Sequence, residues 1–404
     1  IADLSSGGGF GEFYGSLEPV PGREYHALAI LHGAKYPHRV MLQLPDNFDR
    51  KKACVVVSAS SGSRGIYGAI ALAGGWGLPH GCAVAYTDKG AGTDYLDTAE
   101  DTTDNKNAAY SATKYSGDGI APIAVKHANS GDNPEADWGR HVHQAAEFAL
   151  LVLNNAYPDS SPFTYSNTHI IAVGVSTGGG AVLRAAETKD KVFDGVVAIS
   201  PNIWSDKSGG RALYDYSTDA ALWMPCALNA TAFDDVFFAR PGKAKSPAGN
   251  LRCLSLKTLG WLKTETLTEQ AEEAAAYLHR QGWTDRALEA AAFSTSFDLW
   301  RAVSLTYASS YSRRSASEMP CGFSFHALGS DGKARAPTKA EKAAWASDAS
   351  GIPPGAGVAL VDSLAQGTDP ALPGLLCLRA LFDGKDKNAV ATKTGINTTR
   401  ALLP

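Results

Sequence analysis

The stretch that decides the fold reads IIAVGVSTGGGAVLRAA and spans residues 170–186. It begins as an apolar strand pattern and ends as a helical pattern. Between the two lies the pentapeptide GVSTG at 174–178, a G-x-S-x-G sequence. In such a sequence a serine occupies a sharp turn between strand and helix, and glycines on both sides avoid a collision. We therefore predict a strand at 170–175, a helix at 179–187 and Ser176 as a nucleophile, with a structural serine in a glycine-rich turn as the alternative.

The same turn predicts donors for a negative charge that develops on a substrate. The helix after Ser176 points its N-terminus, the positive end of its dipole, at the reacting carbonyl. A second donor is expected from the loop after an earlier strand, and the apolar run 54–58 leads into the small residues at 59–65. We predict an oxyanion hole formed by the N–H of Thr177 and by N–H groups near Ser61 or Gly62. An ordinary turn of small residues is the alternative for this loop.

Outward from this turn the chain alternates short apolar runs with helical patterns, which is typical of a mostly parallel sheet covered by helices. The predicted strands and helices that precede and follow the turn lie at 40–44, 54–58, 66–73 (helix), 82–86, 138–153 (helix) and 192–199. The fold class is therefore α/β, and residues 1–204 are predicted to form the first part of an α/β-hydrolase core. The long polar segment 89–137 is typical of a functional loop excursion.

After residue 204 the chain becomes rich in Ala, Leu, Glu and Thr. Amphipathic helices are expected at 267–278 and 285–303, the first capped by Thr266 or Thr268 and the second by Thr284. We predict that residues 205–375 form a large, mainly helical lid insertion. Residues 376–404 are then expected to return to the core.

Composition excludes several classes of protein. The chain has 404 residues, 44% of them hydrophobic and 19% charged, with a net charge of −4, as in an ordinary globular protein. No basic stripe favours nucleic acid, and no apolar run reaches the roughly 18 residues of a membrane span. Without a CxxC pair or a phosphate loop, we expect no metal and no cofactor. Cys54 and Cys82 are interpreted as unpaired core residues, while disulfides among the other four cysteines are left open.

Five segments give the chain a family resemblance. They read SSGSRGIYGA at 60–69, GCAVAYTDKG at 81–90, KHANS at 126–130, NPEADWG at 133–139 and GVSTGGG at 174–180. Together they resemble the D-(−)-3-hydroxybutyrate oligomer hydrolases, over about residues 18–381. The resemblance implies hydrolysis of ester bonds in short 3-hydroxybutyrate oligomers, the products of polyhydroxybutyrate breakdown. One departure is Thr177, where the family usually has Asn, but the backbone donor is kept.

A second departure concerns the base and acid that a nucleophilic serine needs. Members of the family are longer, and their acid and histidine are expected in a C-terminal section after the lid. The chain is therefore expected to be a fragment, to be completed by a separate C-terminal chain that supplies the acid and histidine, or to build its triad differently. The in-chain candidates are Asp206 for the acid and His326 for the base, with His127 in the loop excursion. Their alternatives are a surface acid, a structural histidine and an inert loop histidine.

The sequence thus predicts a serine ester hydrolase that forms an acyl-enzyme on a small ester or oligoester. An esterase of the same fold on another substrate, such as a feruloyl-type or synthetic polyester, is one alternative. A non-catalytic binding protein that kept the fold is another. The substrate class favours a secreted or periplasmic location, and the cytoplasm is left open.

Overall fold

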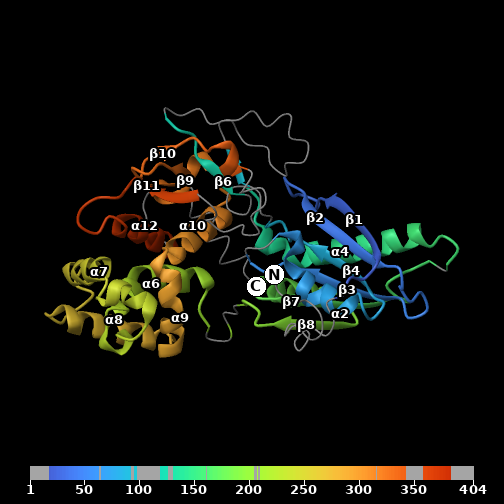
Figure 1. Cartoon of the computed structure of the whole chain (residues 1–404), viewed down its shortest axis with the longest axis horizontal. Coiled ribbons are helices and arrows are strands. Elements are labelled where there is room, and N and C mark those ends of the chain that lie inside the picture. The colour runs from blue at the N-terminus through green and yellow to red at the C-terminus, as the bar shows by residue number, and fades with distance from the viewer. Residues whose placement is uncertain are drawn as a thin grey trace.

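The computed structural model of the chain describes residues 18–62, 65–91, 95–97, 119–125, 131–160, 162–203, 207, 210–314, 316–342 and 358–383. Figure 1 shows that these residues form two lobes, one built around a large sheet and the other mostly helical. The first lobe comprises the described residues up to 203, apart from a short two-stranded sheet. The second lobe follows it in the chain.

The central sheet has six strands in the order β1-β2-β4-β3-β7-β8. Their bounds are Gly22–Ala29 (β1), His38–Pro45 (β2), Cys54–Ala59 (β3), Ala83–Thr87 (β4), His169–Val175 (β7) and Gly195–Ile199 (β8). Strands β4, β3, β7 and β8 are parallel, and β2 pairs antiparallel with both β4 and β1. This mostly parallel sheet, with the G-x-S-x-G turn following β7, is the core of an α/β-hydrolase fold. Every strand predicted in this lobe is present, and β1 was missed because its residues are largely exposed.

Helices cover both faces of the sheet because its strands are apolar on both sides. Helices α4 (Pro134–Ala156) and α5 (Thr177–Ala186) pack on one face, where they enclose residues such as Val55 and Val57 of β3. The opposite face is covered by a 3-10 turn (η1, Ile66–Ala69), a π turn (η2, Ile70–Gly74) and a short α turn (α2, Gly75–Gly77), against Val56. The helix predicted at 66–73 is therefore split into two short pieces, η1 and η2, and α2 follows them.

The second lobe is built from six helices and a small sheet in the described residues. The helices are α6 (Leu213–Ala227), α7 (Pro247–Thr258), α8 (Leu267–Arg280), α9 (Asp285–Ser296), α10 (Leu299–Tyr311) and α12 (Leu372–Asp383). The sheet comprises β9 (Phe323–Leu328), β10 (Ala334–Arg335) and β11 (Val358–Asp362). Strands β5 (Tyr95–Asp97) and β6 (Ile123–Val125) form a separate antiparallel two-stranded sheet, and β6 contacts β9. Single 3-10 turns are η5 (Thr231–Phe233), η6 (Phe237–Ala239), η7 (Pro241–Lys243), η8 (Ala316–Glu318) and η9 (Pro320–Gly322).

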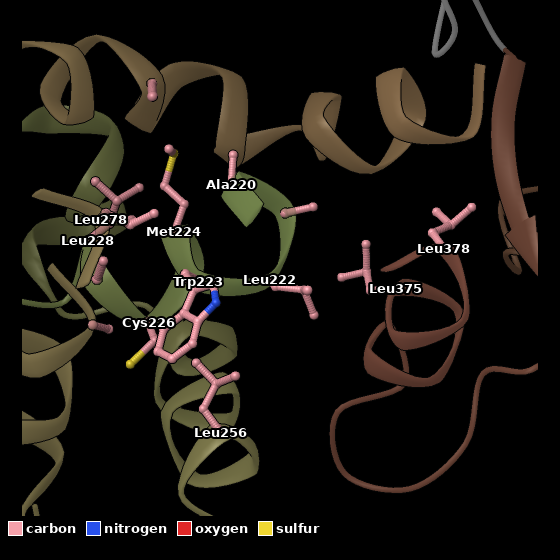
Figure 2. Close-up of a cluster of buried hydrophobic side chains, with 14 of the residues drawn as sticks. Ala220, Leu222, Trp223, Met224, Cys226, Leu228, Leu256, Leu278, Leu375 and Leu378 are labelled. Atoms are coloured by element: carbon pink, nitrogen blue, oxygen red, sulfur yellow. The ribbon is translucent and has the colours of Figure 1, made fainter. Parts of the chain in front are cut away.

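The helical lobe has a hydrophobic core of its own. Figure 2 shows Leu222, Trp223 and Met224 of α6 at the centre of this cluster, with Leu256, Leu278 and Leu375 from other helices around them. Since the central sheet has separate clusters of buried residues, each lobe is stabilised by its own apolar core.

Two helix predictions in this lobe have different outcomes. The side chain of Thr266 accepts a hydrogen bond from Glu269 N and caps α8 in a capping box, which settles the choice between Thr266 and Thr268. The single helix predicted at 285–303 is wrong, because Asp298 adopts a left-handed conformation with φ 61° between α9 and α10. The apolar periodicity continues across this break, so the sequence pattern does not reveal it.

The expected return to the core at residue 376 also differs from the structure. The described part of that range belongs to α12, and the Tyr214 hydroxyl of α6 donates to Leu378 O at 2.8 Å. The Cys321–Cys377 disulfide ties the same helix to η9. The helical lobe therefore extends at least to Asp383, because α12 packs its apolar face on α6 and α10.

All six cysteines are paired. The disulfides are Cys54–Cys82, Cys226–Cys253 and Cys321–Cys377, and no free cysteine is left. The interpretation of Cys54 and Cys82 as unpaired core residues is therefore wrong. They lie at the starts of the adjacent parallel strands β3 and β4, and that proximity becomes visible only when the strands are paired.

Candidate active site

Ser176 occupies the sharp turn between β7 and α5. Its backbone has φ 56° and ψ −124°, an unusual conformation for a residue with a side chain, and the residue is half-buried. The turn closes so tightly that a Cβ on Gly174 would lie 2.2 Å from Gly178 O, and one on Gly178 would lie 2.4 Å from Ala59 O. Both glycines are therefore required sterically, as the G-x-S-x-G pattern predicts.

Backbone hydrogen bonds hold this strained turn in place. Ser176 N donates to Ile199 O at 3.0 Å, which ties the turn to the end of β8. Ser176 O accepts from Gly180 N at 3.1 Å and from Asn202 N at 3.3 Å. Local strain of this kind persists when surrounding contacts over-determine it, and it is frequent at functional sites.

The two predicted oxyanion elements lie side by side. Thr177 is the first residue of α5, where helix N–H groups have no acceptor within the helix. A Cβ on Gly62 would lie 3.4 Å from Thr177 Cγ2, so the loop after β3 contacts the first turn of α5. This follows from the sheet order, because β3 and β7 are parallel neighbours and their carboxyl ends meet at one edge. Ser61 precedes Gly62 in the same loop and is half-buried.

A buried lysine that no sequence pattern reveals contacts this loop. Lys89 follows β4, is 0% exposed, and donates from Nζ to Ser61 O at 3.2 Å and to Ser60 Oγ at 3.3 Å. Burial lowers the pKa of Lys89 to about 8, opposed by the charges of Asp88 and Glu135. The segment 81–90 was recognised for its family resemblance, but an isolated lysine in a sequence gives no sign of burial.

Glu135, on the first turn of α4, links this region to the helical lobe. Burial raises its pKa to about 7, opposed by a hydrogen bond from Tyr311 and by the charge of Lys89. Tyr311 stacks with Tyr307 of α10, their ring centroids 5.3 Å apart, and Tyr307 is hydrogen-bonded to the Asn202 side chain. Because the backbone of Asn202 binds Ser176 O, α10 is linked to the serine turn through Asn202 and approaches Lys89 through Glu135.

The candidate base and acid are not brought to Ser176. His326 lies on β9 in the helical lobe, with Nε2 2.9 Å from Ser324 Oγ, and burial lowers its pKa. Figure 1 places β9 in the lobe opposite β7. Asp206 and His127 lie outside the described residues. Within the described part of the chain, no hydrogen bond joins the Ser176 hydroxyl to a histidine.

Two other histidines, both on α4, have ordinary structural surroundings. The His141 ring packs against that of His38, with centroids 4.4 Å apart, while His143 Nε2 lies 3.0 Å from Ala185 O. Across the described residues, no group of three or more His, Cys, Asp or Glu side chains is arranged to hold a metal. No described helix is long and apolar enough to cross a bilayer.

Comparison with known proteins decides the family. The chain matches the 3HB-oligomer hydrolase family over residues 1–120 and 104–402. The chain belongs to this family. A D-(−)-3-hydroxybutyrate oligomer hydrolase of Paracidovorax citrulli is 35% identical over 99% of this chain and 66% of the relative. One from Polaromonas naphthalenivorans is 34% identical over 98% of this chain and 66% of the relative.

This member of the 3HB-oligomer hydrolase family therefore spans slightly less than two thirds of the length of those relatives. Solved structures are more distant. The cell-wall-degrading esterase LipA of Xanthomonas oryzae is 12% identical, with a TM-score of 0.30 over 68% of this chain and 61% of the esterase. Brefeldin A esterase is 13% identical, with a TM-score of 0.23 over 72% and 81% of the two chains. The α/β-hydrolase assignment therefore rests on the strand order and the serine turn.

Proposed function

We propose that this chain carries the nucleophile of a serine hydrolase that cleaves ester bonds in short 3-hydroxybutyrate oligomers. The observation that carries the proposal is the strained Ser176 turn beside the Gly62 loop, in a member of this family. Ser176 Oγ would attack the ester carbonyl, lose its proton to a base, and expel the alcohol end of the next unit. Water would then cleave the acyl-enzyme and release 3-hydroxybutyrate.

The substrate is tested by comparing two hydrolysis rates. We expect the protein to release 3-hydroxybutyrate from its dimer with a higher kcat/KM than it shows on a generic aryl butyrate. The Ser176→Ala variant should lose both activities. A protein that hydrolyses the aryl ester and is indifferent to the dimer would be an esterase for another acyl group.

We propose further that the base and acid come from a polypeptide section, of this chain or a companion chain, that pairs with the outer edge of β8. No described strand covers that edge, and Val197 and Ile199 are 48% and 41% exposed. Val197 and Ile199 lie on the face of β8 opposite Val196 and Ala198, which pack on the core. Parallel strands are normally covered on both faces, so this bare apolar face and the unpaired edge together favour a missing neighbour. The greater length of the relatives is consistent with such a section.

An edge substitution tests this assembly. Val197→Lys should abolish ester hydrolysis without lowering the melting temperature of the chain alone, because the new charge faces solvent there. Leu151→Lys is the matched control, since Leu151 is 57% exposed on α4, and it should leave hydrolysis unchanged. Equal activity in both variants would show that the β8 edge is not used.

A second candidate function is a non-catalytic binding protein of the same fold. It is favoured by one observation, the lack of a histidine bonded to Ser176 among the described residues.

We also propose an exported location, supported by the pairing of all six cysteines, since disulfides persist in oxidising compartments. Cell fractionation of the native host would test it, and protein found only in the cytosol would contradict it.

A further inference from the structure

The buried cation Lys89 has no role in the ester chemistry proposed above. It lies beside the oxyanion loop, the loop after β3 that carries Ser61 and Gly62. Lys89 follows β4, and its Nζ donates to Ser61 O at 3.2 Å in the neighbouring loop after β3. Its side chain also lies against Trp138, with Nζ 5.5 Å from the ring centroid. Burying an ammonium group costs free energy through desolvation unless the group is paired. Its position beside the predicted site therefore indicates that it serves that site.

The geometry of the peptide bond shows how Lys89 can orient an N–H group in this loop. A trans peptide is planar, and its C=O and N–H groups point in opposite directions. The carbonyl of Ser61 and the N–H of Gly62 belong to one peptide unit, so a carbonyl held toward Lys89 directs the Gly62 N–H away from Lys89. The side away from Lys89 faces the serine turn, because Gly62 contacts Thr177 at the start of α5.

We propose that Lys89 is a positioning residue that orients and polarises the Ser61–Gly62 peptide, so that the Gly62 N–H joins the Thr177 N–H as an oxyanion donor. The inference rests on the ester hydrolase function proposed above. A hydrogen bond from an ammonium group to the carbonyl is charge-assisted, and it makes the N–H of the same peptide a stronger donor.

The charged and titratable groups around Lys89 come from three elements. Asp88 precedes it, but Asp88 Oδ1 already accepts from Arg39 N and Gly90 N, each at 3.0 Å. Glu135 faces it from α4, and Tyr311 of α10 is hydrogen-bonded to Glu135. His141 of α4 lies close to Gly90, the residue that follows Lys89 in the chain.

This arrangement gives the oxyanion loop a pH dependence. Because burial lowers the pKa of Lys89 to about 8, the ammonium group loses its proton as the pH rises through that value. The Ser61–Gly62 peptide is then less polarised and less firmly held. Tyr311 stays protonated over this range, because burial holds its pKa well above the ordinary value.

The first test does not depend on catalysis. The amide of Gly62 is observed by NMR in protein labelled with 15N-glycine, and is assigned by its absence in Gly62→Ala. In wild type and in Ser176→Ala, its shift should titrate with a midpoint near pH 8, and this titration should vanish in Lys89→Met. Because Lys89→Met leaves Glu135 without its counterion, Lys89→Met with Glu135→Gln is the second variant. A Gly62 amide that titrates identically in all four proteins overturns the proposal.

The second test follows the rate at which an aryl phosphonate modifies Ser176. Both lysine variants should react about 100-fold more slowly, the loss typical of removing one oxyanion donor, with unchanged non-covalent affinity. Lys52→Met is the control, since the Lys52 side chain is 75% exposed, and it should react as wild type. Wild-type rates in the lysine variants overturn the proposal. A wild type that does not react while the Gly62 amide still titrates instead contradicts only the hydrolase function.

Discussion

The carbonyl oxygen of Ala59 and the α-carbon of Gly178 are in such close contact that a Cβ on Gly178 would lie 2.4 Å from that oxygen. Ala59 ends β3 and Gly178 is in the first turn of α5, so this contact sets the distance between the oxyanion loop and the serine turn. It predicts that Gly178→Ala displaces one of the two elements.

We expect Gly178→Ala to lower the free energy of unfolding by about 1–3 kcal/mol, the usual cost of overpacking, and to reduce ester hydrolysis at least about 100-fold. Urea unfolding and steady-state kinetics measure the two effects. Gly195→Ala is the matched control in β8, because its Cβ would meet nothing within 4 Å. Equal behaviour of the two variants would show that the Gly178 contact is unimportant.

The helical lobe contains a buried ion pair whose energetics are testable. Arg252 Nε donates to Asp369 Oδ2 at 2.5 Å and Nη2 to Oδ1 at 3.1 Å, with side chains 4% and 9% exposed. Asp369→Asn leaves the guanidinium buried without a counterion, so we expect a loss of about 3–5 kcal/mol in unfolding free energy.

Replacing both partners, as Arg252→Met with Asp369→Leu, should recover most of that loss. Denaturant unfolding of the wild type, Arg252→Met, Asp369→Leu and the double variant gives the coupling energy between the two side chains. Additive losses in the double variant would contradict the account.

The buried carboxyl of Glu135 predicts how stability changes with pH. Its pKa is raised from 4.5 to about 7 by burial, so the folded state binds more protons than the unfolded state between these values. The contribution of Glu135 to stability is therefore fully present below pH 4.5 and is lost as the pH rises through 7.

Urea unfolding at pH 5 and pH 7.5 measures this change. The Glu135→Gln variant, which cannot titrate there, should gain stability relative to wild type as the pH rises. A constant difference between the two proteins across this range would disagree with a raised pKa.

The hydroxyl of Thr177 is predicted to contribute little to stability. Its oxygen is buried and has no hydrogen-bond partner among the described residues. Thr177→Val keeps the shape and the backbone N–H, so we expect an unfolding free energy unchanged or raised by up to about 1 kcal/mol. Thr218→Val is the control, because the Thr218 hydroxyl donates to Tyr214 O at 2.9 Å, and it should be destabilised. A Thr177→Val variant that is markedly less stable would show that the hydroxyl has a partner.

The sequence predicted the sheet and the serine turn because both depend on local patterns. The glycines at 174 and 178 and the apolar run before Ser176 identify the turn without knowledge of distant contacts. The break at Asp298 was missed because the periodicity of α9 continues into α10. The roles of Lys89 and Glu135 were missed for another reason, since their burial depends on how β4, α4 and α10 meet.

Modification of the protein with a fluorophosphonate, with the label located by mass spectrometry, tests whether Ser176 is the nucleophile. We expect one phosphonyl group per chain, on Ser176, and none in Ser176→Ala. An unmodified Ser176 in protein that hydrolyses the ester, or a label on another serine, would contradict this assignment.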